Sequence, residues 1–247
     1  EADRQLRPDC RMLHYGDMEA VKHITERTAA VVVEPIQAES GVTVPPEEWL
    51  PALRKRCNEV GALLILDEIQ TGFGRTGSLF AHQQAGIVPD VMLIAKGMGG
   101  GMPIGAFVAS QKLMQGFTHD PVLGHITTFG GHPVCCAAAE ASLRALLESD
   151  LIAQVPAKEQ LFHELLQHRA IHKVTSKGLL IAVHLSGFEF NKLVIDKCIE
   201  KGVLTDWFLF GSNCLRIAPP LIITEQQIRD ACHIILQSIA EVTAHRM

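Results

Sequence analysis

The stretch that decides the fold is Leu63-Leu64-Ile65-Leu66-Asp67-Glu68-Ile69-Gln70-Thr71-Gly72-Phe73-Gly74-Arg75-Thr76-Gly77. An unbroken apolar run ends at an acid and passes into a glycine-rich loop. A short run of this kind predicts a strand that is covered on both faces, as in a mostly parallel α/β sheet. Open α/β sheets bind ligands at the carboxyl ends of their strands. We therefore expect a ligand site at Asp67, although an acid in this position is also a common helix cap.

A second informative stretch is Val91-Met92-Leu93-Ile94-Ala95-Lys96-Gly97-Met98-Gly99-Gly100-Gly101. Here a lysine ends an apolar strand and opens a glycine-rich turn. Glycines let the backbone approach a ligand closely and adopt positive φ. The stretch is not a phosphate loop of the GxxxxGK[ST] kind, because the lysine precedes the glycines. Taken alone, a lysine at the end of a strand is usually a surface residue, and that is the alternative for Lys96.

The remaining pattern predicts two domains, 1–149 and 150–247. In the first, apolar runs predict strands at 30–34, 63–67, 91–95 and 104–109, and helices at 45–60 and 134–147. The second is expected to be a smaller α+β unit. It would contain helices at 150–167, 191–201 and 225–242, and strands at 178–185, 203–210 and 215–218.

Composition excludes several classes of protein. The 247 residues carry a net charge of −5, which gives no basic footprint for nucleic acid. No apolar run is long enough to cross a bilayer, and residues 1–4 open with charge rather than with a signal-peptide core. The seven cysteines are irregularly spaced and form no metal-ligand pattern. We therefore expect free thiols, no metal site and a cytoplasmic location.

Five ordered segments together resemble the class III aminotransferases, the family of ornithine, acetylornithine and 4-aminobutyrate aminotransferases. Two are the glycine-rich stretches that follow Asp67 and Lys96. The other three are Glu34-Pro35-Ile36-Gln37-Ala38-Glu39-Ser40-Gly41, Thr127-Thr128-Phe129-Gly130-Gly131-His132-Pro133 and Leu215-Arg216-Ile217-Ala218-Pro219-Pro220-Leu221.

The resemblance implies the fold-type I architecture of transferases that depend on pyridoxal 5'-phosphate. The expected parts are a partial, mostly parallel large domain, a small C-terminal α+β domain, and a homodimer with shared active sites. Lys96 would hold the cofactor as an aldimine and then move a proton between substrate and cofactor. That chemistry needs a neutral amine, so we expect a desolvated, electropositive setting for Lys96. Asp67 would pair with the pyridine nitrogen and keep it protonated.

The resemblance also implies roles for residues around the cofactor. Gln70 would hydrogen-bond the ring's 3′ oxygen, and Ile69 would pack on one ring face. Thr128, reaching across the dimer interface, would donate to the cofactor phosphate, with Thr127 assisting through its backbone. A turn before the two glycines is the alternative for Thr128, and Glu68 is left as structural or indirect.

Arg216 would bind a substrate carboxylate, because a planar guanidinium suits bidentate carboxylate binding. The alternative is an interdomain salt bridge. Glu39 resembles the glutamate that pairs with this arginine when an ω-amine substrate is bound and releases it to a dicarboxylate.

The sequence also departs from the family. The resemblance implies a portion ahead of residue 1 that carries a phosphate-binding turn, a ring-stacking aromatic and a second substrate arginine. His132 stands where the family often has Asn, Ala38 and Ser40 stand where Gly is common, and 175–179 departs from the usual pattern.

The function expected is transfer of an amino group from a donor such as ornithine or an acyl-ornithine to 2-oxoglutarate, with 4-aminobutyrate and lysine as further donors. The alternatives are another activity of the same family, such as an aminomutase or a decarboxylase, and an incomplete subunit that is inactive without its N-terminal part.

Overall fold

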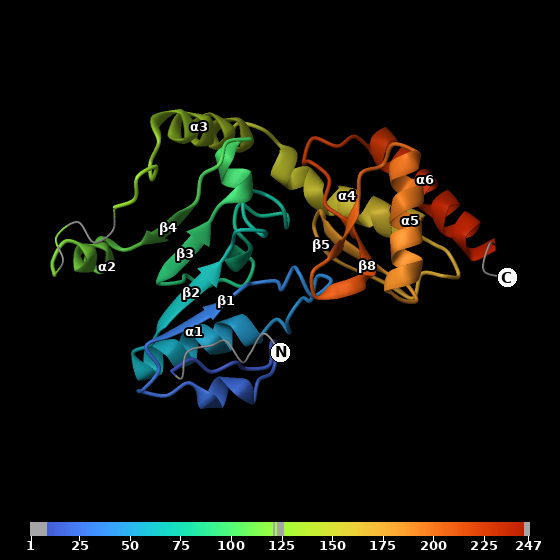
Figure 1. The fold of residues 1–247 in the computed structure, drawn as a ribbon. Coiled ribbons are helices and arrows are strands. Elements are labelled where there is room, and N and C mark those ends of the chain that lie inside the picture. Colours follow the sequence, from blue (N-terminus) through green and yellow to red (C-terminus); the bar gives the residue numbers. More distant parts are fainter. Residues whose placement is uncertain (1–8, 121, 123–125, 245–247) are drawn as a thin grey trace.

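The computed structural model describes residues 9–120, 122 and 126–244, and it contains two four-stranded sheets (Figure 1). The helices α3 (Pro133–Leu147) and α4 (Leu151–Leu165) lie between the two sheets in the chain and join them. The strands of the first sheet are β1 (Ala30–Val33), β2 (Leu63–Asp67), β3 (Val91–Ile94) and β4 (Ala106–Ala109). Those of the second are β5 (Lys173–Lys177), β6 (Leu180–His184), β7 (Asp206–Phe208) and β8 (Gly211–Ile217).

The first sheet has the order β1-β2-β3-β4, with β1, β2 and β3 parallel and β4 antiparallel to β3. The predicted strands are all present, and the predicted mostly parallel arrangement is confirmed. Because β1, β2 and β3 run the same way, their carboxyl ends meet at one edge of the sheet. That edge carries Glu34, Asp67 and, one residue beyond the end of β3, Ala95 followed by Lys96.

The expectation that the strands of this sheet are covered on both faces is wrong for the described residues. The α-helix α1 (Trp49–Val60) covers one face, where Leu64 and Leu66 are fully buried. On the other face Val32 is 65% exposed, and Phe107 of β4 is also exposed. An apolar run indicates that a strand is suited to burial, but the element that packs on its face has to come from elsewhere in the fold.

The helix α1 begins at Trp49, later than the predicted start at residue 45. Pro45 and Pro46 lie ahead of it, and the Trp49 amide donates to the Pro46 carbonyl in a turn at 3.0 Å. Gly61 ends the helix with φ 76°, a conformation that glycine adopts at low cost.

The second sheet is antiparallel throughout, in the order β5-β6-β8-β7. Its face with Ile181, Val183 and Leu215 is completely buried against three long helices. Residues 173–177, which the sequence pattern did not predict as a strand, form its edge strand β5. The helices of this half are α4 (Leu151–Leu165), α5 (Phe188–Glu200) and α6 (Glu225–Ala244), with α3 (Pro133–Leu147) and the short α2 (Gln111–Met114) preceding them.

The two halves, each containing one of the sheets, are joined by hydrogen bonds around Arg75. Arg75 Nη1 donates to the Leu179 carbonyl at 3.1 Å and to the Pro219 carbonyl at 2.5 Å, and the Leu179 amide returns a bond to the Arg75 carbonyl. Burial lowers the pKa of Arg75 below its usual value. Gly178 has φ 62°, and a Cβ there would stand 2.4 Å from the Arg75 carbonyl oxygen, so this close approach requires glycine.

No helix in the described ranges, which omit 1–8, 121, 123–125 and 245–247, is long and apolar enough to span a bilayer.

Candidate active site

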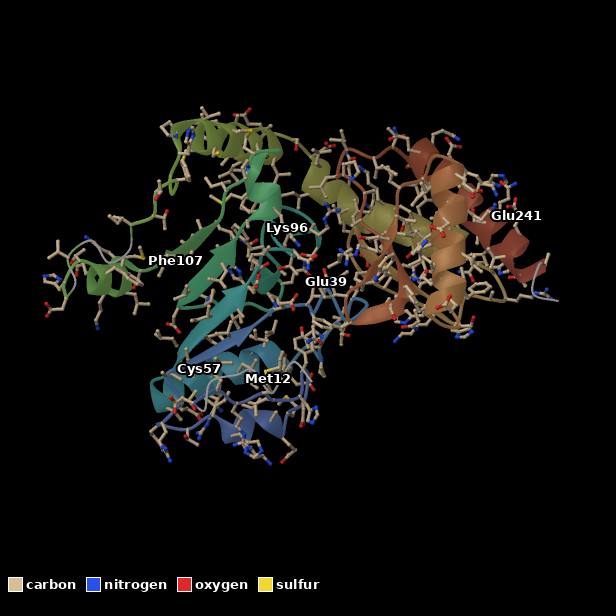
Figure 2. All side chains as sticks on the ribbon, in the orientation of Figure 1. Met12, Glu39, Cys57, Lys96, Phe107 and Glu241 are labelled. Atoms are coloured by element: carbon tan, nitrogen blue, oxygen red, sulfur yellow. The ribbon has the colours of Figure 1, made fainter. Side chains whose placement is uncertain are left out.

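Lys96 opens a 3-10 turn, Lys96–Gly99, directly beyond the end of β3 (Figure 2). Its backbone lies in the left-handed region with φ 47°, which is uncommon for a residue with a side chain. Such conformations are concentrated at functional sites, where the surrounding structure holds them. The turn is held from two sides, because a Cβ on Gly97 would stand 3.3 Å from Phe73 Cβ and one on Gly100 would stand 2.8 Å from Ser142 Cβ.

The side chain of Lys96 is exposed, so the described residues do not give it the desolvated setting that we expected. Within residues 9–120, 122 and 126–244, its ammonium makes no hydrogen bond and no ion pair. A lysine without a partner keeps its amine available for a ligand.

Asp67 is the last residue of β2 and is half-buried. Its Oδ1 accepts a hydrogen bond from the Ile69 amide at 3.0 Å, a local turn contact and not a helix cap, because no helix begins directly after β2 in the described chain. Its Oδ2 has no hydrogen-bond partner in the described part of the chain. One oxygen thus orients the carboxylate, and the other remains able to accept a bond from a protonated ring nitrogen.

Glu34 is a member of this group that the sequence analysis quoted without assigning a role. Burial raises the pKa of Glu34 above its usual value, opposed by the Ala38 amide. The nearby Asp67 and Glu39 carboxylates raise it further, and the Lys96 ammonium lowers it. The charges of Glu34, Asp67 and Lys96 interact because all three residues lie at one edge of the sheet. The signal was available in the sequence, since Glu34 follows β1 as Asp67 ends β2.

Glu68 points away from this edge into a buried hydrogen-bond network. It is completely buried, and its carboxylate accepts from the Thr71 hydroxyl and from the amides of Ala81 and His82. His82 Nδ1 lies 3.0 Å from Glu68 Oε1. The structure thus favours the structural role for Glu68, which fastens the loop after Asp67 to residues 81 and 82.

Glu39 joins Gln70 of the first half to Arg216 of the second. Gln70 Nε2 donates to Glu39 Oε1 at 2.9 Å, and Arg216 Nη2 donates to Glu39 Oε2 at 2.7 Å. The structure therefore brings these three predicted site residues together. Figure 2 shows Glu39 on the loop between the two sheets, close to the carboxyl edge where Lys96 lies.

Arg216 has further neighbours that the sequence did not reveal. Its Nε lies 3.2 Å from Asp206 Oδ1, and its guanidinium stacks over the Phe208 ring with Cζ 4.5 Å from the ring centroid. Asp206 is directly opposite Arg216 in the β7–β8 pairing, which no local pattern encodes. The arginine is thus oriented by a stacked ring and by two carboxylates.

The Glu39 carboxylate is held in its charged form. Burial by itself raises the pKa of Glu39, but hydrogen bonds from the Leu209 amide, Gln70 and Arg216 outweigh that effect. The net result is a pKa of Glu39 below its usual value. A charged Glu39 is thus paired with Arg216, the residue that the sequence predicts to bind a substrate carboxylate.

Thr127 and Thr128 are exposed, on the segment that leads into α3. Figure 1 shows this segment beside β4, on the side of the first sheet away from β1. In the described part of the chain neither threonine contacts Lys96, Asp67 or Gln70. Ile69 is half-buried between Asp67 and Gln70.

Comparison with known proteins identifies the family. The sequence model of the aminotransferase class III family matches residues 5–239. The chain belongs to the class III aminotransferase family. It is 40% identical over 236 residues to a putrescine aminotransferase from Pectobacterium atrosepticum, and 40% identical over 242 residues to an acetylornithine aminotransferase from Corynebacterium efficiens.

Solved structures confirm the predicted fold-type I architecture. An ornithine aminotransferase from Toxoplasma gondii ME49 superposes with a TM-score of 0.87 at 32% identity, covering 98% of this chain and 58% of that one. A second structure of the Toxoplasma gondii enzyme, whose description notes partial occupancy of PLP at the active site, gives 0.86. Pyridoxal phosphate is the cofactor of this family.

The chain spans only part of the relatives that it matches. The matched region is 90% of this chain but 50% of the Pectobacterium enzyme, and 93% of this chain but 57% of the Corynebacterium enzyme.

Proposed function

We propose that the protein is a pyridoxal-phosphate-dependent aminotransferase that moves an amino group from an ω-amino donor, such as ornithine or an acyl-ornithine, to 2-oxoglutarate. The observation that supports this best is the group at the carboxyl edge of the first sheet. Asp67, with one carboxylate oxygen free of hydrogen bonds among the described residues, ends β2. Lys96, which has no partner among those residues, follows the end of the adjacent parallel strand β3. The chain also belongs to a family that uses this cofactor.

The residues present fit the cofactor. The free Asp67 Oδ2 suits a protonated pyridine nitrogen, and the unpaired Lys96 amine suits the aldehyde carbon of the cofactor. Gln70 would donate to the ring oxygen, Ile69 would pack on the ring, and Thr128 with Thr127 would bind the phosphate. When bound, pyridoxal phosphate supplies an electron sink for the substrate carbanion.

Each residue then has a defined task. Asp67, oriented by the Ile69 amide, keeps a proton on the ring nitrogen. Lys96 holds the cofactor at rest and, as a free amine, moves a proton to and from the substrate carbon. Arg216 binds the substrate carboxylate, and Glu39 covers Arg216 when the donor offers no carboxylate there.

The substrate class follows from the Arg216–Glu39 pair. The similar enzymes are named for putrescine, acetylornithine and ornithine, and each of these compounds carries an amine at the end of an aliphatic chain. An arginine that alternates between Glu39 and a dicarboxylate would let one site accept both such a donor and 2-oxoglutarate. An aminomutase or a decarboxylase of the same family would not need this alternation.

We further propose that residues 1–149 form the later part of the large domain and 150–247 the small domain of a cytoplasmic homodimer with shared active sites. The exposed positions of Lys96, Thr127 and Thr128 support this, because the site needs additional walls. An incomplete subunit that is active only with the rest of the family fold is the second candidate, supported by the partial coverage of the relatives.

The test is to incubate the protein with pyridoxal phosphate, reduce it with borohydride, and locate any cofactor-modified lysine by mass spectrometry. Lys96 is expected to carry the label, and Lys112, an exposed lysine on α2, serves as the matched control. Lys96→Ala should abolish the site-specific label. Labelling spread evenly over the surface lysines would contradict a cofactor site at Lys96.

A second measurement separates the two candidates. Before reduction, the protein incubated with pyridoxal phosphate should show an absorbance band that is lost in Lys96→Ala. Adding ornithine or glutamate should bleach this band. A band that forms but does not respond to either amino acid would favour the incomplete subunit.

A further inference from the structure

The loop that carries Glu39 is held in an unusual conformation. Gly41 has φ 88° and Val42 has φ 58°, and Val42 is completely buried although it is β-branched. Positive φ at a β-branched residue is strained, so the surroundings must hold it in place. The amides of Gly41 and Val42 both donate to the Ala38 carbonyl, which closes the loop on itself.

The second sheet provides the surface on which this loop lies. In its register His184 pairs with Cys214, and Ala182 pairs with both Thr175 and Arg216. Because side chains alternate along a strand, Thr175, His184, Cys214 and Arg216 lie on the same face. The Phe210 amide donates to the Glu39 carbonyl at 3.0 Å, which brings the loop onto that face.

Three side chains on this face form a chain of hydrogen bonds that ends on the loop. The Thr175 hydroxyl donates to the Gly41 carbonyl at 2.7 Å. His184 Nε2 lies 2.8 Å from the same hydroxyl oxygen, and His184 Nδ1 lies 3.2 Å from Cys214 Sγ. A Cβ on Gly41 would stand 3.1 Å from that sulfur, so the loop is in close contact with the chain.

Counting protons fixes the direction of every bond. Thr175 has one hydroxyl proton, and the Gly41 carbonyl can only accept, so the hydroxyl donates to it. The Thr175 oxygen must then accept from His184, which places the ring proton on Nε2. The unprotonated Nδ1 can only accept, so the Cys214 thiol donates to it at 3.2 Å; Asn213 Oδ1, at 3.7 Å from the sulfur, is a second and more distant acceptor for the same proton. The series runs from Cys214 through His184 and Thr175 to the Gly41 carbonyl.

The pKa shifts agree with this assignment. Burial lowers the pKa of His184, and Lys173 and His172 lower it further, against the opposing effect of the Gly41 carbonyl. Burial raises the pKa of the Cys214 thiol. A neutral imidazole beside a protonated thiol is the pair that the geometry requires.

We propose that Thr175, His184 and Cys214 are positioning residues that hold the 39–42 loop on the second sheet and thereby set the Glu39 carboxylate against Arg216. None of the three is expected to touch substrate or cofactor. By holding the loop, they favour binding of Arg216 by Glu39 over binding by a substrate carboxylate. This effect on substrate binding rests on the function proposed above.

The chain offers a matched control for testing Thr175. Ser176 is the next residue on β5 and points to the opposite face, where its hydroxyl bonds to His163 and Glu159. Each hydroxyl thus has one histidine partner and one oxygen acceptor. Thr175→Val removes the hydroxyl that contacts the 39–42 loop, and Ser176→Ala removes the one that does not. Thr175→Ser keeps the hydroxyl and should restore the wild-type behaviour.

The first readout is amide hydrogen exchange at Gly41, Val42 and Thr43 in the full chain. Thr175→Val should accelerate exchange there about fivefold or more, as expected for the loss of one or two buried hydrogen bonds. Ser176→Ala and Thr175→Ser should leave these amides unchanged. Equal acceleration in Thr175→Val and Ser176→Ala, or none in either, would overturn the proposal.

The second readout is the pair of ¹⁵N shifts of the His184 ring. The wild-type protein should show a proton on Nε2 and none on Nδ1, and Cys214→Ala should shift the Nδ1 signal. A proton found on Nδ1 would contradict the series of bonds.

The third readout is substrate selection in the active enzyme. Thr175→Val should lower the KM for 2-oxoglutarate relative to that for an ω-amine donor by about threefold, because a looser Glu39 competes less for Arg216. An unchanged ratio alongside faster loop exchange would overturn the link to Arg216. Absence of any transaminase activity would count against the proposed function, while the exchange and ring data would still decide the positioning role.

Discussion

Two valines at similar places in their strands show how the two sheets differ. Val32 in β1 is 65% exposed, and Val183 in β6 is completely buried. Each lies inside an unbroken apolar run, so the local sequence gives no reason for the difference. The second sheet is covered by α4, α5 and α6 within its own half, whereas the first has α1 on one face only.

The first and second halves of the molecule therefore differ in the interactions that order them. The second half has a large apolar core of its own. At its carboxyl edge the first half is ordered by polar contacts, chiefly the buried Glu68 network. A site built on polar contacts leaves charged side chains accessible, which suits the binding of a charged cofactor.

The largest expected effect tests the polar network of the first half. Glu68→Ala should lower the free energy of unfolding by about 3–5 kcal/mol, because it leaves the buried amides of Ala81 and His82 without acceptors. Urea denaturation measures it. Glu140→Ala, which removes an exposed ion pair with Arg144, should cost less than about 1 kcal/mol. Similar losses for the two variants would mean that Glu68 does not order this edge.

The direct comparison of the sheets comes next. Val183→Ala should cost about 2 kcal/mol, since it removes buried methyl groups from a closed core. The identical change at Val32 should cost less than about 0.5 kcal/mol. Thermal or urea unfolding of the two single variants gives the answer. A cost at Val32 equal to that at Val183 would show that the exposed face of β1 is covered in solution.

The smallest effect concerns the ion pair between the halves. The pKa of Glu39 lies below its unfolded value of 4.5, so its contribution to stability is present above pH 4.5 and is lost as the pH falls through the folded pKa. Glu39→Gln should cost no more than about 1 kcal/mol at pH 7 and progressively less in acid. Urea titrations at several pH values measure this. A cost that grows as the pH falls would reverse the sign and refute the ion pair's contribution.

Several parts of the site could be predicted from the sequence because they depend on strand ends. Asp67 and Lys96 stand at or directly after the carboxyl ends of apolar runs, and parallel strands bring such ends together. The same rule, applied to the first strand, would have identified Glu34. The exposure of Lys96 could not be predicted, because it depends on what covers the edge rather than on the strand itself.

Other parts could not be predicted because they join residues that are far apart in the chain. Asp206 faces Arg216 only through the pairing of β7 with β8. The strand β5 was missed because 173–177 alternates weakly and is half-buried at the edge of its sheet. Its Thr175 reaches the Gly41 carbonyl across 134 positions of sequence.

The sequence by itself determined the α/β class, the family, the strand ends that carry Asp67 and Lys96, and the turns that glycine allows at their ends. These features depend on side-chain periodicity and backbone conformation, which act over a few residues. Only the tertiary structure decided which face of each sheet is buried and which charges meet. The Glu39–Arg216 pair spans 177 positions, and the free energy that holds it comes from packing the two halves together.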